Sequence, residues 1–279
     1  MSLARLNDVL ALAAAKNRGI PAFDTLDYET AQAYLDAAEE TGSPAVMMVG
    51  EAQFPYINRK RLFPYLVRLA EAASVPVALQ LDHGKTMDSI RLCIDSGFTS
   101  IMYDGSHLPY EENVRQTKQV VDYCHPLGIS VEAEIGHVGG GEGQEQGSTV
   151  DRSAFTDPDE AVSFVRETGV DALAVAIGTV HGPFKTEPDL DFSLTKMLGK
   201  LIPVPLVMHG ASGVPISDLQ QAIQAGIRKI NIYSDISYGC SHVAYDTLRH
   251  RNGTMHYLEL MHSVQAEAMK RFITLFSAL

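Results

Sequence analysis

Short aliphatic runs alternate with helical patterns along the whole chain, and this alternation constrains the fold more than any other feature of the sequence. The runs are rich in valine, isoleucine and leucine and lack a polar alternation, which is typical of parallel strands buried on both faces. Eight strands are predicted, at residues 19–23, 45–49, 77–81, 100–103, 130–134, 172–177, 204–208 and 229–232. Eight strand–helix rounds predict an α/β fold, the (β/α)8 barrel.

The segments between these strands carry the spacing of amphipathic helices. Residues 28–41, for example, place Ala31, Leu35 and Ala38 on one face. A glycine follows several of these patterns before the next strand begins, and each is predicted to end a helix: Gly42, Gly97, Gly128, Gly169 and Gly226.

The length of 279 residues suits one barrel, which needs roughly 250 residues, so we expect a single domain over residues 1–279. A glycine-rich stretch at 136–149 is too long for an ordinary strand–helix connection and is predicted to be a mobile active-site loop. Two additional C-terminal helices are predicted at 234–249 and 255–276, the second packing either on its own barrel or on a neighbouring subunit.

The net charge of -12 argues against nucleic acid or an anionic membrane as a partner, because both would repel the protein. No apolar run approaches the roughly 20 residues of a membrane span, and the N-terminus lacks a signal-like apolar core, so a cytoplasmic protein is expected. The three cysteines, Cys93, Cys124 and Cys240, are widely spaced and are predicted to be reduced, buried thiols.

Three histidines, His83, His181 and His209, follow predicted strands, and each has a glycine beside it. The C-terminal ends of barrel strands meet on one face, so these imidazoles are predicted to form a zinc site that keeps a fourth position open for substrate. Other polar residues follow strands on the same face: Asp24, Asp82, Asp104, Glu132, Glu134 and Asn231. The remaining seven histidines are expected to have solvent or capping roles.

Glycines near these histidines predict a second feature, a site for an anion. Gly182, the turn at 210–213 and Ser234 would leave backbone N–H groups available after strands six to eight, where barrels frequently bind phosphate. Ser212 and Asn231 add side-chain donors. A bound phosphate is therefore expected on the same face as the metal.

At these residues the chain resembles the class II, zinc-dependent fructose-bisphosphate aldolases, especially the tagatose-bisphosphate branch. The motifs lie at 81–83, 103–108, 131–134, 176–182, 209–213 and 229–231, so the resemblance covers nearly the whole chain. It implies a carbon–carbon lyase of carbohydrate metabolism that is a homodimer or homotetramer.

The resemblance also implies roles for single residues. His83, His181 and His209 match the catalytic zinc ligands, and Asp104 and Glu134 match positions that hold or relay a second or displaced metal. Asp82 matches the residue that moves the proton of the aldol hydroxyl, and Glu142 matches one that exchanges the donor's carbon-bound proton. The donor-phosphate pocket, often with a monovalent cation, is matched by Gly182, Lys185, Gly210, Ser212, Asn231 and Ser234.

The half of the site that would hold the second product, an aldehyde, departs from the family. Asp24 replaces an asparagine, Gly50 replaces a serine, and Tyr233 stands where relatives are acidic or small. The arginine expected before the last helix is replaced within 252–256. We therefore expect cleavage of a ketose 1-phosphate or ketose bisphosphate to dihydroxyacetone phosphate and an aldehyde, with an atypical acceptor pocket.

Three alternatives stay open at this point. A conventional tagatose or fructose bisphosphate remains possible as substrate if another basic side chain contacts the second phosphate, the candidates being Arg59, Arg249, Arg251 and His256. A metal-dependent hydrolase could use a zinc-bound hydroxide on the same barrel. A third alternative is a member without activity that binds a sugar phosphate as a sensor.

Overall fold

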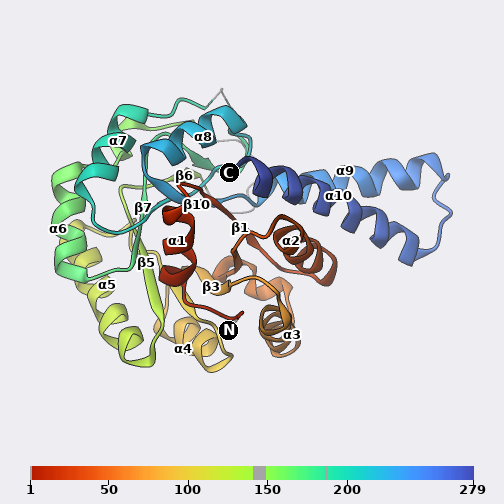
Figure 1. The fold of residues 1–279 in the computed structure, drawn as a ribbon, viewed down its shortest axis with the longest axis horizontal. Helices are drawn as coiled ribbons and strands as arrows, with labels where there is room; N and C mark the ends of the chain where they lie inside the picture. The colour runs from red at the N-terminus through yellow and green to blue at the C-terminus, as the bar shows by residue number, and fades with distance from the viewer. Residues whose placement is uncertain (1, 141–148, 186–187) are drawn as a thin grey trace.

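The computed structural model, which describes residues 2–140, 149–185 and 188–279, contains a closed barrel of eight parallel strands (Figure 1). Around the barrel the strand order is β1-β10-β9-β7-β5-β4-β3-β2. The strands are β1 Ile20–Asp24, β2 Ala45–Gly50, β3 Val77–Gly84, β4 Ser100–Tyr103, β5 Ser130–Ile135, β7 Ala172–Val175, β9 Leu206–Met208 and β10 Ile227–Asn231. The predicted (β/α)8 barrel is confirmed.

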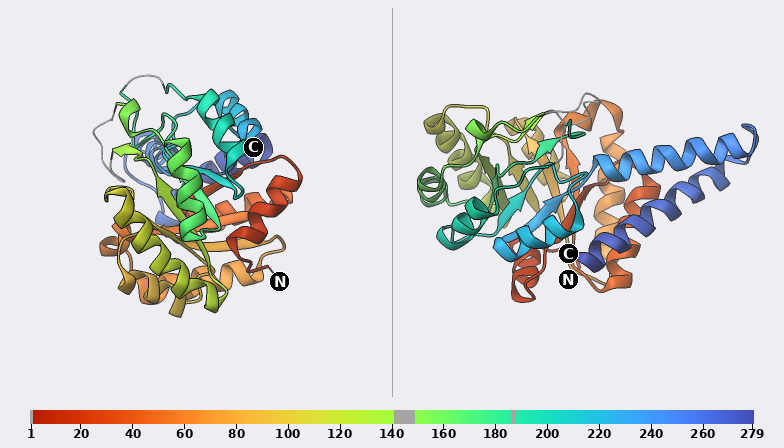
Figure 2. Two further views of the ribbon diagram at one scale, coloured as in Figure 1. Left: turned by 90° about the vertical axis from the view of Figure 1, so that its left-hand side faces the viewer. Right: turned by 90° about the horizontal axis from the view of Figure 1, so that it is seen from above.

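Most of the helices connect successive strands and surround the barrel, whereas the first precedes β1 and the last two follow β10 (Figures 1 and 2). They are α1 Leu6–Ala15, α2 Tyr28–Thr41, α3 Arg59–Ala72, α4 Met87–Asp95, α5 Tyr110–Cys124, α6 Pro158–Thr168, α7 Phe192–Leu201, α8 Ile216–Ala225, α9 Ser234–His250 and α10 Tyr257–Ala278. The described residues also form short 3-10 helices at η1 Glu51–Tyr56, η2 His125–Leu127 and η3 Arg152–Ala154. All five predicted glycines follow a helix and have positive φ, from 61° at Gly42 to 128° at Gly226, which glycine adopts without steric cost.

Helix α1 was not predicted, and it covers the N-terminal end of the barrel. Its side chains Leu6, Val9 and Leu10 are fully buried. Just before the helix, the backbone N–H of Ala4 donates to the carbonyl of Val77, at the start of β3. With this end closed, the opposite end of the barrel is the one that can accept a ligand.

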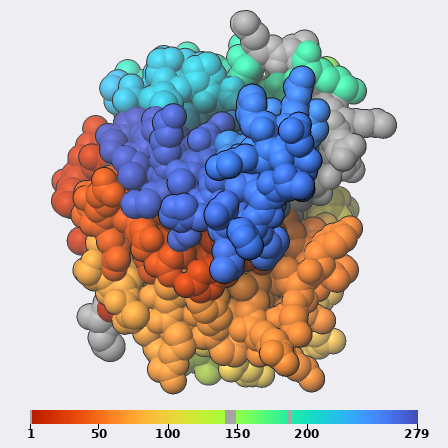
Figure 3. All heavy atoms as spheres, turned by 90° about the vertical axis from the view of Figure 1, so that its right-hand side faces the viewer, coloured from red at the N-terminus to blue at the C-terminus, as the bar shows by residue number. Residues whose placement is uncertain are grey.

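The two predicted C-terminal helices are confirmed, and α9 and α10 form a hairpin that extends beyond the barrel (Figures 1 and 2). The end of α10 packs on its own barrel, where the ring centroid of Phe272 lies 4.8 Å from that of Phe23 and 5.1 Å from that of Tyr34. Residues 241–263, in contrast, include no buried side chain. Figure 3 views the molecule from this side, with the hairpin in front of the barrel.

The predicted loop at 136–149 lies only partly in the described residues. A two-residue strand, β6 Gly139–Gly140, pairs in parallel with β8, Val180–His181, outside the barrel sheet. Glu142 lies outside the described residues. None of the described helices has the length and apolar character needed to cross a membrane. The three cysteines are buried and form no disulfide, as predicted.

Candidate active site

The three predicted metal-binding histidines come together at the C-terminal end of the barrel. His83 lies in β3, His181 ends β8 and His209 directly follows β9. Each offers one ring nitrogen, and these three nitrogens lie within 4.8 Å of one another. The ring of His83 is central, with its centroid 4.9 Å from His181 and 4.7 Å from His209. Three imidazole nitrogens this close together can bind one metal ion.

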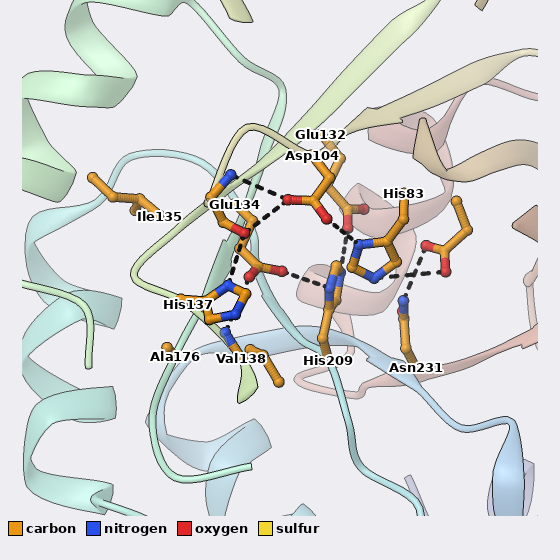
Figure 4. Close-up of polar contacts among 12 residues, drawn as sticks. His83, Asp104, Glu132, Glu134, Ile135, His137, Val138, Ala176, His209 and Asn231 are labelled. Atoms are coloured by element: carbon orange, nitrogen blue, oxygen red, sulfur yellow. Dashed lines mark hydrogen bonds and ion pairs between the residues drawn. The ribbon is translucent and has the colours of Figure 1, made fainter. Parts of the chain in front are cut away.

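Carboxylates hold the outer nitrogens of two of these rings (Figure 4). His83 Nδ1 lies 2.9 Å from Asp104 Oδ2, and His209 Nε2 lies 2.9 Å from Glu132 Oε1. A carboxylate that accepts the proton of one ring nitrogen orients the ring and leaves the other nitrogen to bind metal, as in carboxylate–histidine–zinc arrangements. The donor set therefore fits zinc.

The charges around the rings also fit a cation. Burial by itself disfavours an imidazolium, but Glu132 and Glu134 outweigh it and raise the pKa of His209 to about 9. Glu134 Oε2 lies 2.9 Å from the inner nitrogen, His209 Nδ1. These carboxylates thus favour positive charge where a metal would bind. Burial and the neighbouring His83 lower the pKa of His181 to about 4, so this ring is neutral and able to coordinate.

Beneath the histidines, a polar network occupies the barrel interior. Glu132 and Lys229 are fully buried, and Lys229 Nζ lies 2.9 and 3.1 Å from the two carboxylate oxygens. Gln80 Nε2 also donates to Glu132, at 3.0 Å. Burial raises the pKa of Glu132, but Lys229 and His209 outweigh this effect and lower it to about 2. The ionised Glu132 can therefore hold His209 in place.

Sequence reasoning did not include Lys229 and Gln80 in the site, although the signal was available. Gln80 follows three apolar residues at the start of β3, and Lys229 precedes Ile230 in β10; both residues are fully buried. Such a residue needs a partner inside the barrel, because an unpaired buried charge or amide is costly.

Asp82 lies beside the metal-binding rings and lines a cavity together with His83. Its Oδ2 is 3.9 Å from His83 Nε2, and its Oδ1 accepts a hydrogen bond from Asn231 Nδ2 at 3.3 Å. His181 lines the same cavity. The carboxylate of Asp82 is therefore placed to exchange a proton with a substrate that also reaches His83 and His181.

Most of the predicted phosphate-site residues line this cavity, namely Gly182, Gly210, Ser212, Asn231 and Ser234. Ser212 Oγ accepts hydrogen bonds from the backbone N–H groups of Tyr233 and Asp235, both at 3.2 Å, which fixes the 210–213 turn against the start of α9. A helix N-terminus with exposed N–H groups attracts anions. The predicted Lys185 is exposed and does not line the cavity.

Gly210 cannot carry a side chain in this turn. Its φ is 64°, and a Cβ atom would lie 2.4 Å from the carbonyl oxygen of Val180 in β8. The close approach of these two backbones positions the turn next to His181.

The predicted acceptor-pocket residues are only partly brought together. Asp24 and Tyr233 line the cavity, but Gly50 does not. Gln53, three residues further along in η1, lines it instead, together with Met48 of β2. Sequence analysis predicted neither Gln53 nor Met48 as a site residue. The available signal was that Gly50 has no side chain, so that another group could fill the space beside it.

Asp104 and Glu134 face a second hollow on the other side of the histidines. Asp104 Oδ1 accepts hydrogen bonds from Ser106 N and Oγ, at 3.1 and 2.8 Å, and Glu134 Oε1 accepts one from Val138 N at 3.2 Å. Two of the histidines expected to have only solvent or capping roles, His107 and His137, also line this hollow.

A parallel barrel whose strand ends present three histidines, two of them held by carboxylates, an aspartate and an anion-binding turn defines a metal-dependent enzyme of the (β/α)8 class. The family model for class-II fructose-bisphosphate aldolase matches residues 4–278, and the chain belongs to that family. It is therefore an aldolase, a carbon–carbon lyase, and zinc dependence is typical of the class.

Similarity to individual proteins agrees with this assignment. The chain is 38% identical over 254 residues to fructose-bisphosphate aldolase from Staphylococcus aureus, covering 89% of this chain and 87% of the relative. It is 42% identical over 238 residues to fructose-bisphosphate aldolase from Geobacillus stearothermophilus, covering 84% and 82%. Among solved structures, the YdjI aldolase from Escherichia coli K12 is similar with a TM-score of 0.88 and 35% identity, covering 99% of this chain and 97% of that one.

Proposed function

We propose that this aldolase is zinc-dependent and reversibly cleaves a ketose 1-phosphate or ketose bisphosphate to dihydroxyacetone phosphate and an aldehyde. One observation carries the proposal: the nitrogens of His83, His181 and His209 lie within 4.8 Å of one another, and two of the rings border the cavity that contains Asp82. Zinc held by these nitrogens would act as a Lewis acid that polarises the substrate carbonyl.

Asp82 is proposed as the acid and base at the aldol hydroxyl. In cleavage it takes the hydroxyl proton, the carbon–carbon bond breaks, and the electron pair of that bond remains on the donor fragment. A proton is then delivered to the donor carbon, a role proposed for Glu142. Condensation reverses these steps, and Asp82 returns its proton to the new hydroxyl oxygen.

The donor phosphate is proposed to bind to the turn at Gly210 and Ser212, to Gly182 and Asn231, and to the N-terminus of α9 at Ser234. Backbone N–H groups and neutral side chains supply these contacts. Lys185 and a monovalent cation are proposed to add positive charge at the outer side of this pocket. A second metal position is proposed at Asp104 and Glu134.

The acceptor pocket favours an aldehyde without phosphate. Among the described residues that line the cavity there is no lysine or arginine, and Asp24 contributes a carboxylate. A second phosphate would lose water there without gaining a charge-assisted partner. We therefore propose that a ketose 1-phosphate is a better substrate than a bisphosphate.

The basic residues that could have restored a conventional bisphosphate site lie elsewhere in this chain. Arg59 stacks on the ring of Phe54 at 5.0 Å and lines a different surface hollow. Arg249, Arg251 and His256 are exposed where α9 connects to α10, at the end of the hairpin farthest from the barrel (Figure 1). Membership of an aldolase family argues against the hydrolase and against the inactive sensor.

We propose that the protein is cytoplasmic and forms a homodimer or homotetramer, and the α9–α10 hairpin supports the association of copies. Tyr245, Tyr257 and Leu258 are 62, 69 and 80% exposed, and a two-helix hairpin has no interior in which to bury them. Burial against a second copy would remove this apolar surface from water. Light scattering coupled to gel filtration tests this proposal, and a monomer at micromolar concentration would contradict it.

The function is tested by a coupled assay for dihydroxyacetone phosphate, with and without chelator, on fructose and tagatose bisphosphates and on ketose 1-phosphates that lack the distal phosphate. We expect chelator-sensitive release that is fastest from a 1-phosphate. A preference for a bisphosphate would retain the chemistry and refute the argument about the acceptor pocket. Absence of release from every substrate would refute the proposed function.

A further inference from the structure

Gln53 is a buried amide whose carbonyl oxygen lacks a partner. The residue is only 9% exposed, and Oε1 is buried without a hydrogen bond to any described residue. A buried polar atom of this kind normally has a partner, and one that faces a cavity obtains it from a ligand or from water. Gln53 lines the same cavity as Asp82 and His83.

The position of this amide depends on Gly50. A Cβ atom built on Gly50 would lie 2.1 Å from Gln53 Oε1 and 3.0 Å from its Cδ. Gly50 has φ -75° and ψ 143°, a conformation that any residue can adopt, so its backbone does not require glycine. The glycine is explained instead by the space that the Gln53 amide occupies.

The location within the fold assigns Gln53 to the acceptor half of the site. It lies in the 3-10 helix η1, which directly follows β2 and therefore starts at the cavity. Asp24, at the end of the neighbouring strand β1, lines the same side, and β1 and β2 pair in parallel. The proposed donor-phosphate residues follow β8, β9 and β10 instead.

We propose that Gln53, whose amide occupies the space beside Gly50, is a specificity-determining residue that accepts a hydrogen bond from a hydroxyl group of the aldehyde in the cavity. The inference rests on the proposed function and adds the class of acceptor, a neutral hydroxylated aldehyde. A neutral amide oxygen suits a hydroxyl donor, whereas a phosphate oxygen would be repelled by it and by Asp24. A site built to bond a substrate hydroxyl discriminates against an analogue that lacks it.

The test compares two three-carbon aldehydes, glyceraldehyde and propionaldehyde, as acceptors for condensation with dihydroxyacetone phosphate. The measured quantity is the ratio of their kcat/KM values. Gln53→Leu is expected to lower this ratio about 10- to 100-fold, because it removes the acceptor of the hydroxyl hydrogen bond. Solvent deuterium exchange into dihydroxyacetone phosphate, followed by NMR for every variant, reports the donor half alone, and we expect it to change far less than the ratio.

Gly50→Ala provides a second, independent route to the same effect. Its added methyl group must displace the end of the Gln53 side chain, which is flexible, so the variant is expected to fold and to lower the ratio as well. The double variant is expected to show no further loss, since both changes act through one amide. Gln220→Leu is the matched control, because this glutamine is exposed and donates a hydrogen bond to the carbonyl of Ala278 at the protein surface.

The outcomes separate the two proposals. If the wild-type protein exchanges deuterium and condenses aldehydes but Gln53→Leu leaves the ratio within twofold, Gln53 has no role in specificity. An additive loss in the double variant would refute the dependence on Gly50. If the wild-type protein neither exchanges deuterium nor forms product, the aldolase function itself fails and this inference fails with it.

Discussion

Replacing Lys229 by methionine tests how the barrel interior supports the metal-binding histidines. Lys229 is fully buried and bonds both oxygens of Glu132. Methionine is similar in length but has no charge, so the substitution leaves the Glu132 carboxylate in the barrel without its cation. Hydrogen bonds from Gln80 and His209 remain.

The expected loss follows from the burial of the pair. Removing one partner of a fully buried ion pair costs about 3–5 kcal/mol, because the remaining charge is uncompensated. At roughly 2.1 cal/mol/K of unfolding entropy per residue, this energy corresponds to a fall in Tm of about 5–9 °C for a chain of 279 residues.

The assay is thermal unfolding followed by circular dichroism in the presence of chelator, so that bound metal does not contribute to stability. Glu132→Gln alone leaves the Lys229 ammonium unpaired and is expected to destabilise similarly. The double variant removes both charges and is expected to regain most of the lost stability. The matched control is Lys118→Met, which removes an exposed lysine paired with Asp122 at 3.0 Å and should lower Tm by less than about 2 °C.

Metal affinity separates the two roles of Glu132. This carboxylate orients His209, so Glu132→Gln is expected to weaken zinc binding about 10- to 100-fold, both alone and combined with Lys229→Met. The double variant should thus recover stability without recovering affinity, as measured by competition with a chromophoric chelator. The reasoning is refuted if Lys229→Met lowers Tm no more than Lys118→Met does, or if the double variant is no more stable than the single ones.

Three further predictions concern the cavity. Asp82→Ala should lower aldol turnover about 100- to 10,000-fold while the zinc content, measured by atomic absorption, is unchanged; near-normal turnover would contradict its proton-transfer role. Ser212→Ala frees the 210–213 turn from α9, so KM for a ketose 1-phosphate should rise about tenfold with a smaller change in kcat, and an unchanged KM would place the phosphate elsewhere. Gly210→Ala places Cβ against the carbonyl oxygen of Val180 and should destabilise the protein by about 1–3 kcal/mol in denaturant unfolding, whereas full stability would mean that this turn can move.

The barrel and the face that carries the site could both be predicted from local sequence patterns. The strands and the helix-ending glycines, such as Gly42 and Gly128, are local features, because each depends on a few neighbouring residues. In a parallel barrel every strand ends on the same face, so the order of elements alone was enough to gather His83, His181 and His209 there. Family motifs named the same residues.

Which polar groups meet inside the barrel could not be predicted from local patterns. Gln80, Glu132 and Lys229 lie in β3, β5 and β10, none of which are neighbours in the sheet, so their contact depends on the tilt and register of the closed barrel. The periodicity of a single strand carries no information about what lies across the interior. Sequence analysis could therefore place Glu132 on the correct face but could not find its partners.

In the acceptor half of the site, too, the sequence could not predict which side chains meet, even for residues that are close together in the chain. The sequence located Gly50 correctly at the end of a strand, but which group occupies the space beside it depends on how η1 turns back over the cavity. The positions of α1 and of the projecting α9–α10 hairpin likewise depend on packing. An apolar stripe predicts that one face of a helix is buried, but it does not identify the element against which that face packs. Local patterns fixed the elements, and long-range packing fixed their partners.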